Sequence, residues 1–335
     1  TLHQLATIAQ DRGDLEEAER LYRRSLEIFE SLGDRRGISA TLHQLATIAQ
    51  DRGDLEEAER LYRRSLEIFE SLGDRRGVAK TLHQLATIAQ DRGDLEEAER
   101  LYRRSLEIFE SLGDRRGISA TLHQLAMIAQ IRGDLEEAER LYRRSLEIDE
   151  SLGDRRGISA TLHQLATIAQ IRGDLEEAER LYRRSLEIFE SLGLRVDAAI
   201  TRAALAVLLR SSGRLSEAIS LMEDANSTLS RVGHRLARRA AVDLASMLVE
   251  LALSSAQADP EGARSTLLRA SDFLEEADPP LAEACRRTAE AVSALSEGDQ
   301  GRALSLLGEA LPDLARLGPR VLFALLSLVE SVGGG

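Results

Sequence analysis

Five of the six histidines recur once in every forty residues of the first half of the chain, so the same chemical group is repeated at a fixed interval. They are His3, His43, His83, His123 and His163. Imidazole is a common zinc ligand and a general acid or base near neutral pH. A metal needs ligands within a few ångströms of one another, whereas equivalent residues of stacked helical repeats lie roughly 10 Å apart. We therefore expect these side chains to form hydrogen bonds on a surface and not to hold a metal.

The other residues that could carry chemistry do not form a catalytic pattern. Cys285 is the only cysteine, so the sequence holds no disulfide pair, and no histidine stands in a context that would activate the thiol. The sequence has no Gly-rich phosphate loop followed by Lys, no His-Glu-x-x-His and no Gly-x-Ser-x-Gly. Glu56 and Glu57 recur in every copy, as is typical of a solvated helix face. We expect no enzymatic activity and no cofactor.

Charge and hydropathy narrow the class of partner. The net charge is −13, with acidic residues in every repeat, which disfavours binding to nucleic acid or anionic lipid. The longest strongly apolar stretch, Val321 to Val329, is far shorter than the roughly 20 residues that span a bilayer. We expect a cytoplasmic protein. Because the chain starts in mid-pattern without Met and ends in three glycines, we also expect it to be a fragment of a larger protein.

The elements that position the histidines follow from one complete repeat, which begins at Asp34. A first helix is predicted from Asp34 to Gly53, because apolar residues recur at helical spacing and Gly53 offers a left-handed end. The apolar stripe of this helix consists of Ile38, Leu42, Leu45 and Ala49. Asp54 then acts as the cap of a second helix, with Glu57 three residues later completing the capping pattern, and Gly73 ends it.

The second helix carries an apolar stripe that is too wide for one neighbour. The stripe consists of Leu55, Ala58, Tyr62, Leu66, Phe69 and Leu72. Turns of about two or three residues make the two helices antiparallel, and stacking of the next hairpin covers the remaining apolar surface. The sequence therefore predicts an all-α solenoid of stacked antiparallel helix hairpins.

One set of residues gives this unit a family resemblance. Within one repeat they are Leu45, Ala46, Ala49, Gly53, Leu55, Ala58, Tyr62, Ser65 and Leu66. This pattern resembles the tetratricopeptide repeat, although the period is 40 where the family usually has 34, and Glu70 stands at the position where Pro commonly ends the motif. The resemblance implies a right-handed superhelix whose first helices line a concave groove for a protein or peptide. Long units of this kind are similar to the C-terminal sensor arrays of bacterial signal-transducing ATPases and regulators.

The repeats lose their regularity along the chain. We expect five near-identical repeats over residues 1–193, a diverged sixth over 194–233, two degenerate repeats over 234–318, and a terminal helix with a glycine tail over 319–335. The terminal helix reads VLFALLSLV and is apolar on nearly every side. It is either a cap buried against the eighth repeat or a surface for self-association, as a dimer or end to end, through Leu322, Phe323 and Leu326.

The few residues that differ between the repeats indicate where a ligand could bind. Up to Gly193 the departures from the majority residue are Val78, Ala79, Lys80, Met127, Ile131, Asp149 and Ile171. Four of the seven fall on the stripe of the first helix that lies opposite its apolar stripe. Ile131 and Ile171 replace Asp, and Met127 lies one turn from Ile131, so they add apolar surface to a polar groove. Neutral drift after recent duplication explains so small a sample equally well.

These observations predict a binding site and a function. The expected ligand groove comprises Lys80, His83, Thr87, Asp91, His123, Met127, Gln130, Ile131, His163, Thr167, Gln170 and Ile171. The chain is then a scaffold that holds a protein or peptide segment, as the sensor or interaction part of a larger bacterial regulator. The alternative is an architectural module that self-associates through its end helices.

Overall fold

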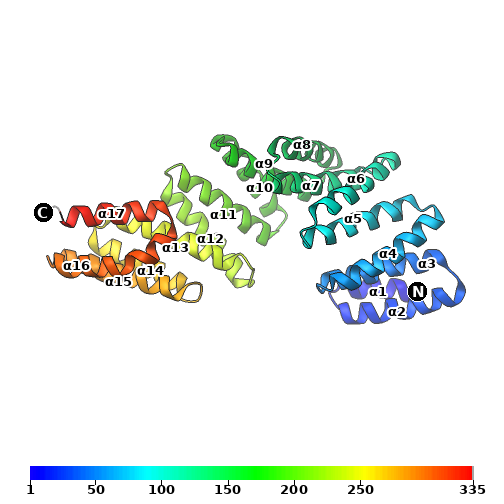
Figure 1. The fold of residues 1–335 in the computed structure, drawn as a ribbon, viewed down its shortest axis with the longest axis horizontal. Helices are drawn as coiled ribbons and strands as arrows, with labels where there is room; N and C mark the ends of the chain where they lie inside the picture. Colours follow the sequence, from blue (N-terminus) through cyan, green and yellow to red (C-terminus); the bar gives the residue numbers. More distant parts are fainter. Residues whose placement is uncertain (334–335) are drawn as a thin grey trace. The chain divides into compact units, whose positions relative to one another are not determined.

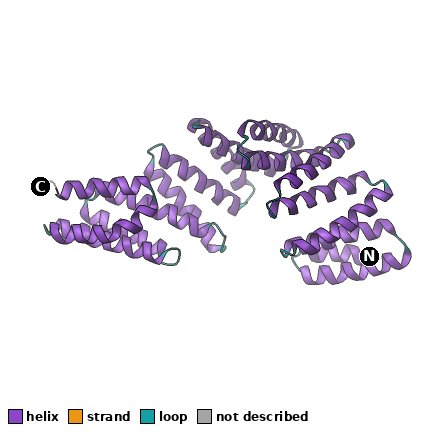
Figure 2. Ribbon diagram, viewed as in Figure 1, coloured by secondary structure: helices purple, strands orange, loops and turns teal. Residues whose placement is uncertain are grey.

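The computed structural model of the chain describes residues 1–333, and Gly334 and Gly335 of the expected glycine tail lie outside the described residues. The described residues form seventeen α-helices and one 3-10 helix, and no strand occurs among them (Figure 2). The chain divides into two compact units, Thr1–Thr161 (unit 1) and Leu162–Gly335 (unit 2). The fold is an all-α solenoid of helix hairpins, as the sequence predicts.

Unit 1 consists of near-identical hairpins, in which odd-numbered helices are the first helix of a repeat and even-numbered helices the second (Figure 1). Each helix packs against the next along the chain from α1 to α8. The next helix, α9 (Arg155–Arg172), contributes residues to both units. The helices of unit 1 are α1 Leu2–Asp11, α2 Leu15–Leu32, α3 Arg35–Asp51, α4 Leu55–Leu72, α5 Arg75–Asp91, α6 Leu95–Leu112, α7 Arg115–Ile131 and α8 Leu135–Leu152.

The helix ends follow from local sequence. The Asp34 carboxylate accepts a hydrogen bond from Gly37 N (3.0 Å), and Asp54 accepts one from Glu57 N (3.1 Å). Gly73 ends α4 in the left-handed region, with φ 69°. The capping pattern predicts a reciprocal bond from the Glu57 side chain to the backbone of Asp54. Instead, the Glu57 carboxylate pairs with Arg60 (2.7 Å). A guanidinium one turn along the helix competes for the carboxylate with the backbone of the cap.

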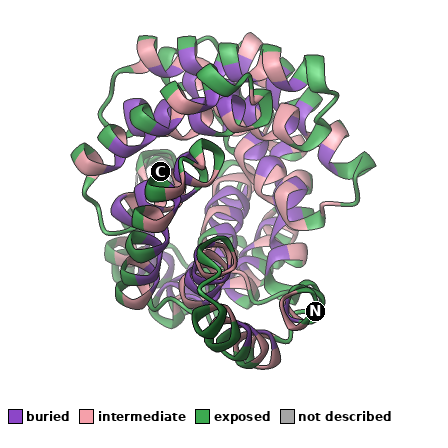
Figure 3. Cartoon of the chain, turned by 90° about the vertical axis from the view of Figure 1, so that its right-hand side faces the viewer, coloured by how far each residue is buried: buried purple, intermediate pink, exposed green. Residues whose placement is uncertain are grey.

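The core of unit 1 repeats most of its contacts from hairpin to hairpin. Ala58 and Tyr62 are fully buried, and the Ser65 hydroxyl donates to the Ser39 carbonyl of the preceding helix (2.9 Å). The Phe69 ring lies so close to Gly77 that a Cβ there would come within 2.5 Å of it, which requires glycine. Figure 3 shows buried residues where helices meet and exposed residues along the turns. These contacts fix the register between a helix and its neighbours.

Unit 2 keeps the hairpin order with a different core. Met222 is fully buried at the position of the tyrosine in earlier repeats, and Pro260 and Pro279 each occupy a first turn of a helix, where proline costs no hydrogen bond. Its helices after α9 are α10 Leu175–Ser191, α11 Arg195–Ser211, α12 Leu215–Arg231, α13 Ala237–Ser255, α14 Pro260–Leu274, α15 Pro279–Ser296, α16 Gln300–Leu314, the 3-10 helix Ala315–Leu317 and α17 Pro319–Gly333.

The terminal helix α17 packs against α13 and α16. Val321, Leu325 and Leu328 are buried, whereas Phe323 is 74% exposed and Leu326 is 45% exposed. The helix therefore has one buried stripe and one exposed apolar stripe.

Candidate functional site

The repeated histidines connect consecutive repeats. His43 Nδ1 lies 3.1 Å from Thr81 Oγ1, which stands 38 residues later on the first helix of the next repeat. The same bond recurs in unit 1 for His3, His83 and His123, and in unit 2 for His163. Each ring also makes an edge contact with the tyrosine of its own repeat, with centroids 5.0–5.3 Å apart. The prediction that these side chains form hydrogen bonds is confirmed, and the partner is the neighbouring repeat.

Burial controls the charge of these histidines. Desolvation lowers the pKa of His43, His83, His123 and His163 to about 4, and the positive charge of Lys80 adds to this effect at His43. The rings are therefore neutral at pH 7 and do not titrate near it. Within the part of the chain that the structure describes, no group of three or more His, Cys, Asp or Glu side chains is arranged so that it could hold a metal ion.

A tyrosine hydroxyl anchors the surface beside each histidine. Tyr62 Oη lies 2.9 Å from Thr47 Oγ1 and donates to Gln50 Oε1 (3.3 Å). In the next repeat Thr87 makes the same contact with Tyr102, and burial raises the pKa of this phenol to about 12. Of the predicted groove residues, Thr87, Thr167, Gln130 and Gln170 thus bind the tyrosines of the core. These bonds hold the side chains of this surface in fixed positions.

Two repeats of unit 1 depart from this network. In the repeat of Tyr102 the bond from tyrosine to glutamine is missing, and Gln90 Oε1 is buried without a hydrogen-bond partner. In the repeat that follows, the threonine itself is replaced. Met127 takes the place of the threonine, so Tyr142 keeps only its bond to Gln130 (3.2 Å). Met127 is half-buried, and Ile131, one turn further along α7, is 60% exposed at the position that Asp51 and Asp91 hold in earlier repeats. The two side chains form an apolar strip on the first-helix surface of unit 1.

The remaining predicted groove residues differ in how much of them a ligand could touch. Lys80 and Asp91 are exposed on α5, and Ile171 is 59% exposed on α9, within unit 2. The half-buried members are His83, Thr87, His123, Gln130, His163, Thr167 and Gln170. The exposed members thus include the last residues of α5 and α7, whereas the half-buried members belong to the hydrogen-bonded network.

A polar cavity lies beside Asp149. From the sequence alone, Asp149 is only a residue that differs from its equivalents in the other repeats. Asp149 is 5% exposed at the position that Phe69 and Phe109 hold in earlier repeats, and it leaves a cavity of about 420 Å³. The cavity is lined by Arg116, Ser119, Ala120, His123, Gln124, Ser145, Asp149, Asp154, Arg156, Gly157, Ala160 and Thr161. The available signal was the replacement of an aromatic residue by a carboxylate within a predicted buried stripe.

The carboxylate in this cavity has one hydrogen-bond donor among the side chains around it. The Ser119 hydroxyl donates to Asp149 Oδ1 (2.5 Å) and also contacts Ser145 Oγ (2.9 Å). Burial raises the pKa of Asp149, the Ser119 bond opposes this rise, and the charge of Asp154 adds to it. The repeat that carries the apolar strip therefore also holds a carboxylate where other repeats place an aromatic ring.

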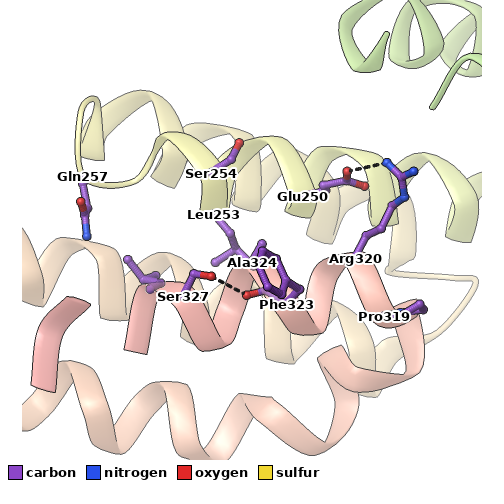
Figure 4. Close-up of a pocket in the computed structure, with 10 residues that line it drawn as sticks. Glu250, Leu253, Ser254, Gln257, Pro319, Arg320, Phe323, Ala324 and Ser327 are labelled. Atoms are coloured by element: carbon purple, nitrogen blue, oxygen red, sulfur yellow. Dashed lines mark hydrogen bonds and ion pairs between the residues drawn. The ribbon is translucent and has the colours of Figure 1, made fainter. Parts of the chain in front are cut away.

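A second pocket, of about 680 Å³, lies between α13 and α17 (Figure 4). Phe323, which the sequence predicted for self-association, lines this pocket, while Leu322 is half-buried and Leu326 is exposed. Arg320 lies at one end, where it donates to the Arg210 carbonyl (3.0 Å) and lies 3.6 Å from the Glu250 carboxylate. The same carboxylate pairs with Arg210 (2.7 Å). The pocket thus has an apolar wall beside a charged cluster.

Of the helices that the structure describes, none has the length and apolar character needed to cross a membrane.

Comparison with known proteins identifies the repeat. The family model described as "Tetratricopeptide repeat" matches residues 1–71, 77–151 and 157–225. No curated protein sequence matches the chain.

Solved structures share the fold at low sequence identity. A signal transduction ATPase with numerous domains and a tetratricopeptide repeat sensor, from Pyrococcus horikoshii, matches with a TM-score of 0.68 at 20% identity, over 98% of this chain and 49% of that one. BtubC (BKLC) from P. vanneervenii matches with a TM-score of 0.57 at 22% identity, over 65% of this chain and 92% of that one. Yeast Tom70 matches with a TM-score of 0.51 at 15% identity, and this chain spans 60% of its length.

Proposed function

Because the chain belongs to the tetratricopeptide repeat family, we propose that it is a cytoplasmic scaffold that binds a protein or peptide segment in the groove lined by the first helix of each repeat. It acts by binding and not by catalysis. The resemblance to a signalling ATPase that carries a repeat sensor supports a role as the sensor or interaction part of a larger bacterial regulator.

The observation that carries the proposal is the apolar strip of Met127 and Ile131. Ile131 is 60% exposed, so burial in the core does not explain an apolar residue at this position. Earlier repeats place a charged Asp there. Exposed apolar side chains within a polar surface mark contact sites, and the flexible Met side chain adapts to varied partners. A strip of this kind fits one or two apolar side chains of a ligand.

The surroundings of the strip define the rest of the ligand. Gln130 and His123 present polar edges beside it, and both are already held by hydrogen bonds to Tyr142 and Thr161. A surface that is ordered in advance loses little conformational entropy on binding. We expect a segment with apolar side chains for the strip and backbone groups free to bond with the polar edges.

The test compares the original chain with three variants of it as baits for a displayed peptide library. One carries Met127→Thr with Ile131→Asp, which restores the majority residues in unit 1. A second carries Ile171→Asp, which tests the contribution of unit 2 separately. A third carries Glu136→Gln on the exposed surface of α8 and serves as the matched control.

Peptides that bind the original chain and the Glu136→Gln control, and that lose at least tenfold in affinity for the double variant, support the groove. Circular dichroism establishes that every form is folded. Equal binding to all forms would show that Met127 and Ile131 arose by neutral sequence drift, and the groove proposal would then fail.

The exposed stripe of α17 favours a second candidate, self-association. Phe323 is 74% exposed and, with Leu322 and Leu326, gives unit 2 an apolar surface of its own. Sedimentation equilibrium of the original chain and of a Phe323→Glu, Leu326→Glu variant tests it. A dimer that becomes a monomer on substitution supports the candidate, and a monomer in both cases excludes it.

A further inference from the structure

The cavity at Asp149 has a charged group where earlier repeats have a ring. In those repeats Phe69 and Phe109 are 9% and 4% exposed, so the ring lies in the core. Asp149 is 5% exposed at the same position on α8, and the cavity of about 420 Å³ lies beside it. The position is buried to a similar extent in all three repeats, but Asp149 presents a carboxylate to whatever enters the cavity.

The helices on either side fix the direction of this carboxylate. Ser119 on α7 donates to its Oδ1 (2.5 Å), and Oδ2 lies so close to Gly157 in the first turn of α9 that a Cβ there would overlap it. No arginine within residues 1–333 forms an ion pair with Asp149. A hydroxyl donor leaves the negative charge in place, and a buried charge without an opposite charge beside it lowers stability.

The charged residues around the cavity leave its interior negative. Arg116, Arg156 and Asp154 line the cavity but are exposed, so water and salt screen their charges more than that of the buried Asp149. Burial lowers the pKa of His123 to about 4, so this ring is neutral at pH 7. A cation that enters therefore meets the least screened charge of the cavity, which is a negative one.

The rest of the lining suits an ammonium group on a short apolar chain. An ammonium has three N–H donors and no acceptor, so it needs several oxygens around it. Ser145, Thr161 and Gln124 bring hydroxyl and amide oxygens to the lining, and Ala120 and Ala160 bring small apolar walls. A cavity of this volume is large enough for a small organic molecule.

The cavity opens on the surface of the first helices. Ala120 of its lining is exposed at the position that Lys80 holds in the preceding repeat, and His123 is a member of the predicted groove. Met127 follows His123 one turn later on α7, about 6 Å along the helix axis. One ligand can therefore reach both the cavity and the apolar strip.

We propose that the Asp149 cavity binds a primary alkylammonium group, carried either by a free alkylamine or by a lysine side chain of a bound protein segment. The ammonium supplies the opposite charge that the buried carboxylate lacks, and charge-assisted hydrogen bonds are the stronger ones. Only the lysine source rests on the proposed function, because a free amine needs no groove ligand.

The lysine source also predicts a sequence pattern in the segment. An extended chain advances about 3.3 Å per residue, so the distance from His123 to Met127 corresponds to roughly two residues. A segment that fills both sites therefore carries a lysine roughly two residues from the apolar side chain that contacts Met127.

The first experiment titrates the full chain with n-butylammonium at pH 7 and follows the transverse relaxation of the amine protons by nuclear magnetic resonance. 1-Butanol is the matched neutral probe. Asp149→Asn removes the charge and keeps the cavity, whereas Asp149→Phe restores the ring of earlier repeats. Glu136→Gln removes an exposed charge and controls for general attraction of a cation to a chain of net charge −13.

We expect saturable binding of n-butylammonium to the original chain and to Glu136→Gln, and at least tenfold weaker binding to Asp149→Asn. Asp149→Phe should not bind it, and 1-butanol should bind the original chain at least tenfold more weakly. Circular dichroism checks that every variant is folded. Absence of saturable binding, or equal binding to the original chain and Asp149→Asn, would overturn the proposal.

A second experiment distinguishes the two sources. Peptides that bind the original chain are tested for displacement of n-butylammonium, with lysine and with norleucine in its place. Displacement by the lysine form alone assigns the site to a lysine side chain, and binding without displacement assigns it to a free amine. The Met127→Thr, Ile131→Asp variant keeps its affinity for n-butylammonium, so the cavity and the groove proposal fail independently.

Discussion

Unit 1 and the later helices of unit 2 form the same hairpins with different interiors. In unit 1 a tyrosine, a histidine and a threonine of the next repeat are linked at every step, as Tyr62, His43 and Thr81 show. From α12 onward the interior is mostly alanine, leucine and other apolar residues, with Met222 at the tyrosine position. The hairpin needs only volume and apolar character at that position, so the polar network is an addition to the fold.

The helix caps also differ between the two units. Aspartate caps nearly every helix of unit 1, whereas Leu194 and Arg214 precede α11 and α12 without a side-chain hydrogen bond. Side-chain caps are missing from α11 to α13 and return at α14 to α16, where Asp259, Asp278 and Asp299 accept backbone N–H bonds, while the packing persists throughout. Tertiary contacts therefore hold helices whose own ends contribute little.

The largest expected effect is a loss of stability of unit 1 in mild acid. Histidines whose folded pKa is lowered to about 4 stabilise the fold above the unfolded value of 6.5, and this contribution is lost as the pH falls from 6.5 towards 4. Each histidine should cost about 1 kcal/mol at pH 5.5. Hydrogen exchange at pH 7 and 5.5 measures the change helix by helix.

Helices α13 to α16 contain no histidine and serve as the internal control. Their opening free energies should change much less than those of α3 to α7 over the same range. A uniform change along the chain would contradict the assignment of the acid sensitivity to the histidines.

The next effect is a gain in stability on Asp149→Phe. This change fills the cavity and removes a buried carboxylate, and it should raise the free energy of unfolding by about 2 kcal/mol at pH 7. Urea unfolding of the full chain measures it. Asp149→Asn separates loss of charge from gain of volume, and no gain from Asp149→Phe would show that the cavity does not weaken the fold.

The pH dependence of that gain has a defined sign. Because the folded pKa of Asp149 is raised, the carboxylate destabilises the fold increasingly as the pH rises through the unfolded value, and fully above the folded value. The advantage of Asp149→Asn should therefore shrink on acidification.

The smallest effect concerns the caps. Leu194→Asp places in unit 2 the cap that Asp34 and Asp114 supply in unit 1, and it should add about 1 kcal/mol to the stability of α11. Asp114→Ala should remove about as much from α7. Hydrogen exchange of the two helices checks both, and an unchanged α11 would show that its backbone does not need the cap.

The sequence predicts the helix limits well because they depend on neighbouring residues, as at Asp34, Asp54 and Gly73. Partners across repeats were not predictable, because the bond between His43 and Thr81 depends on the register of two helices. The cavity at Asp149 depends on three helices together. The apolar character of Ile131 was readable from its replacement of Asp, whereas its exposure required the fold.

We propose above all that Met127 and Ile131 contact a ligand in the groove. The most direct measurement is isothermal titration of one display-selected peptide against the original chain and the Met127→Thr, Ile131→Asp variant. We expect at least a tenfold loss of affinity in the variant with an unchanged fold. Equal affinity for both forms would contradict it.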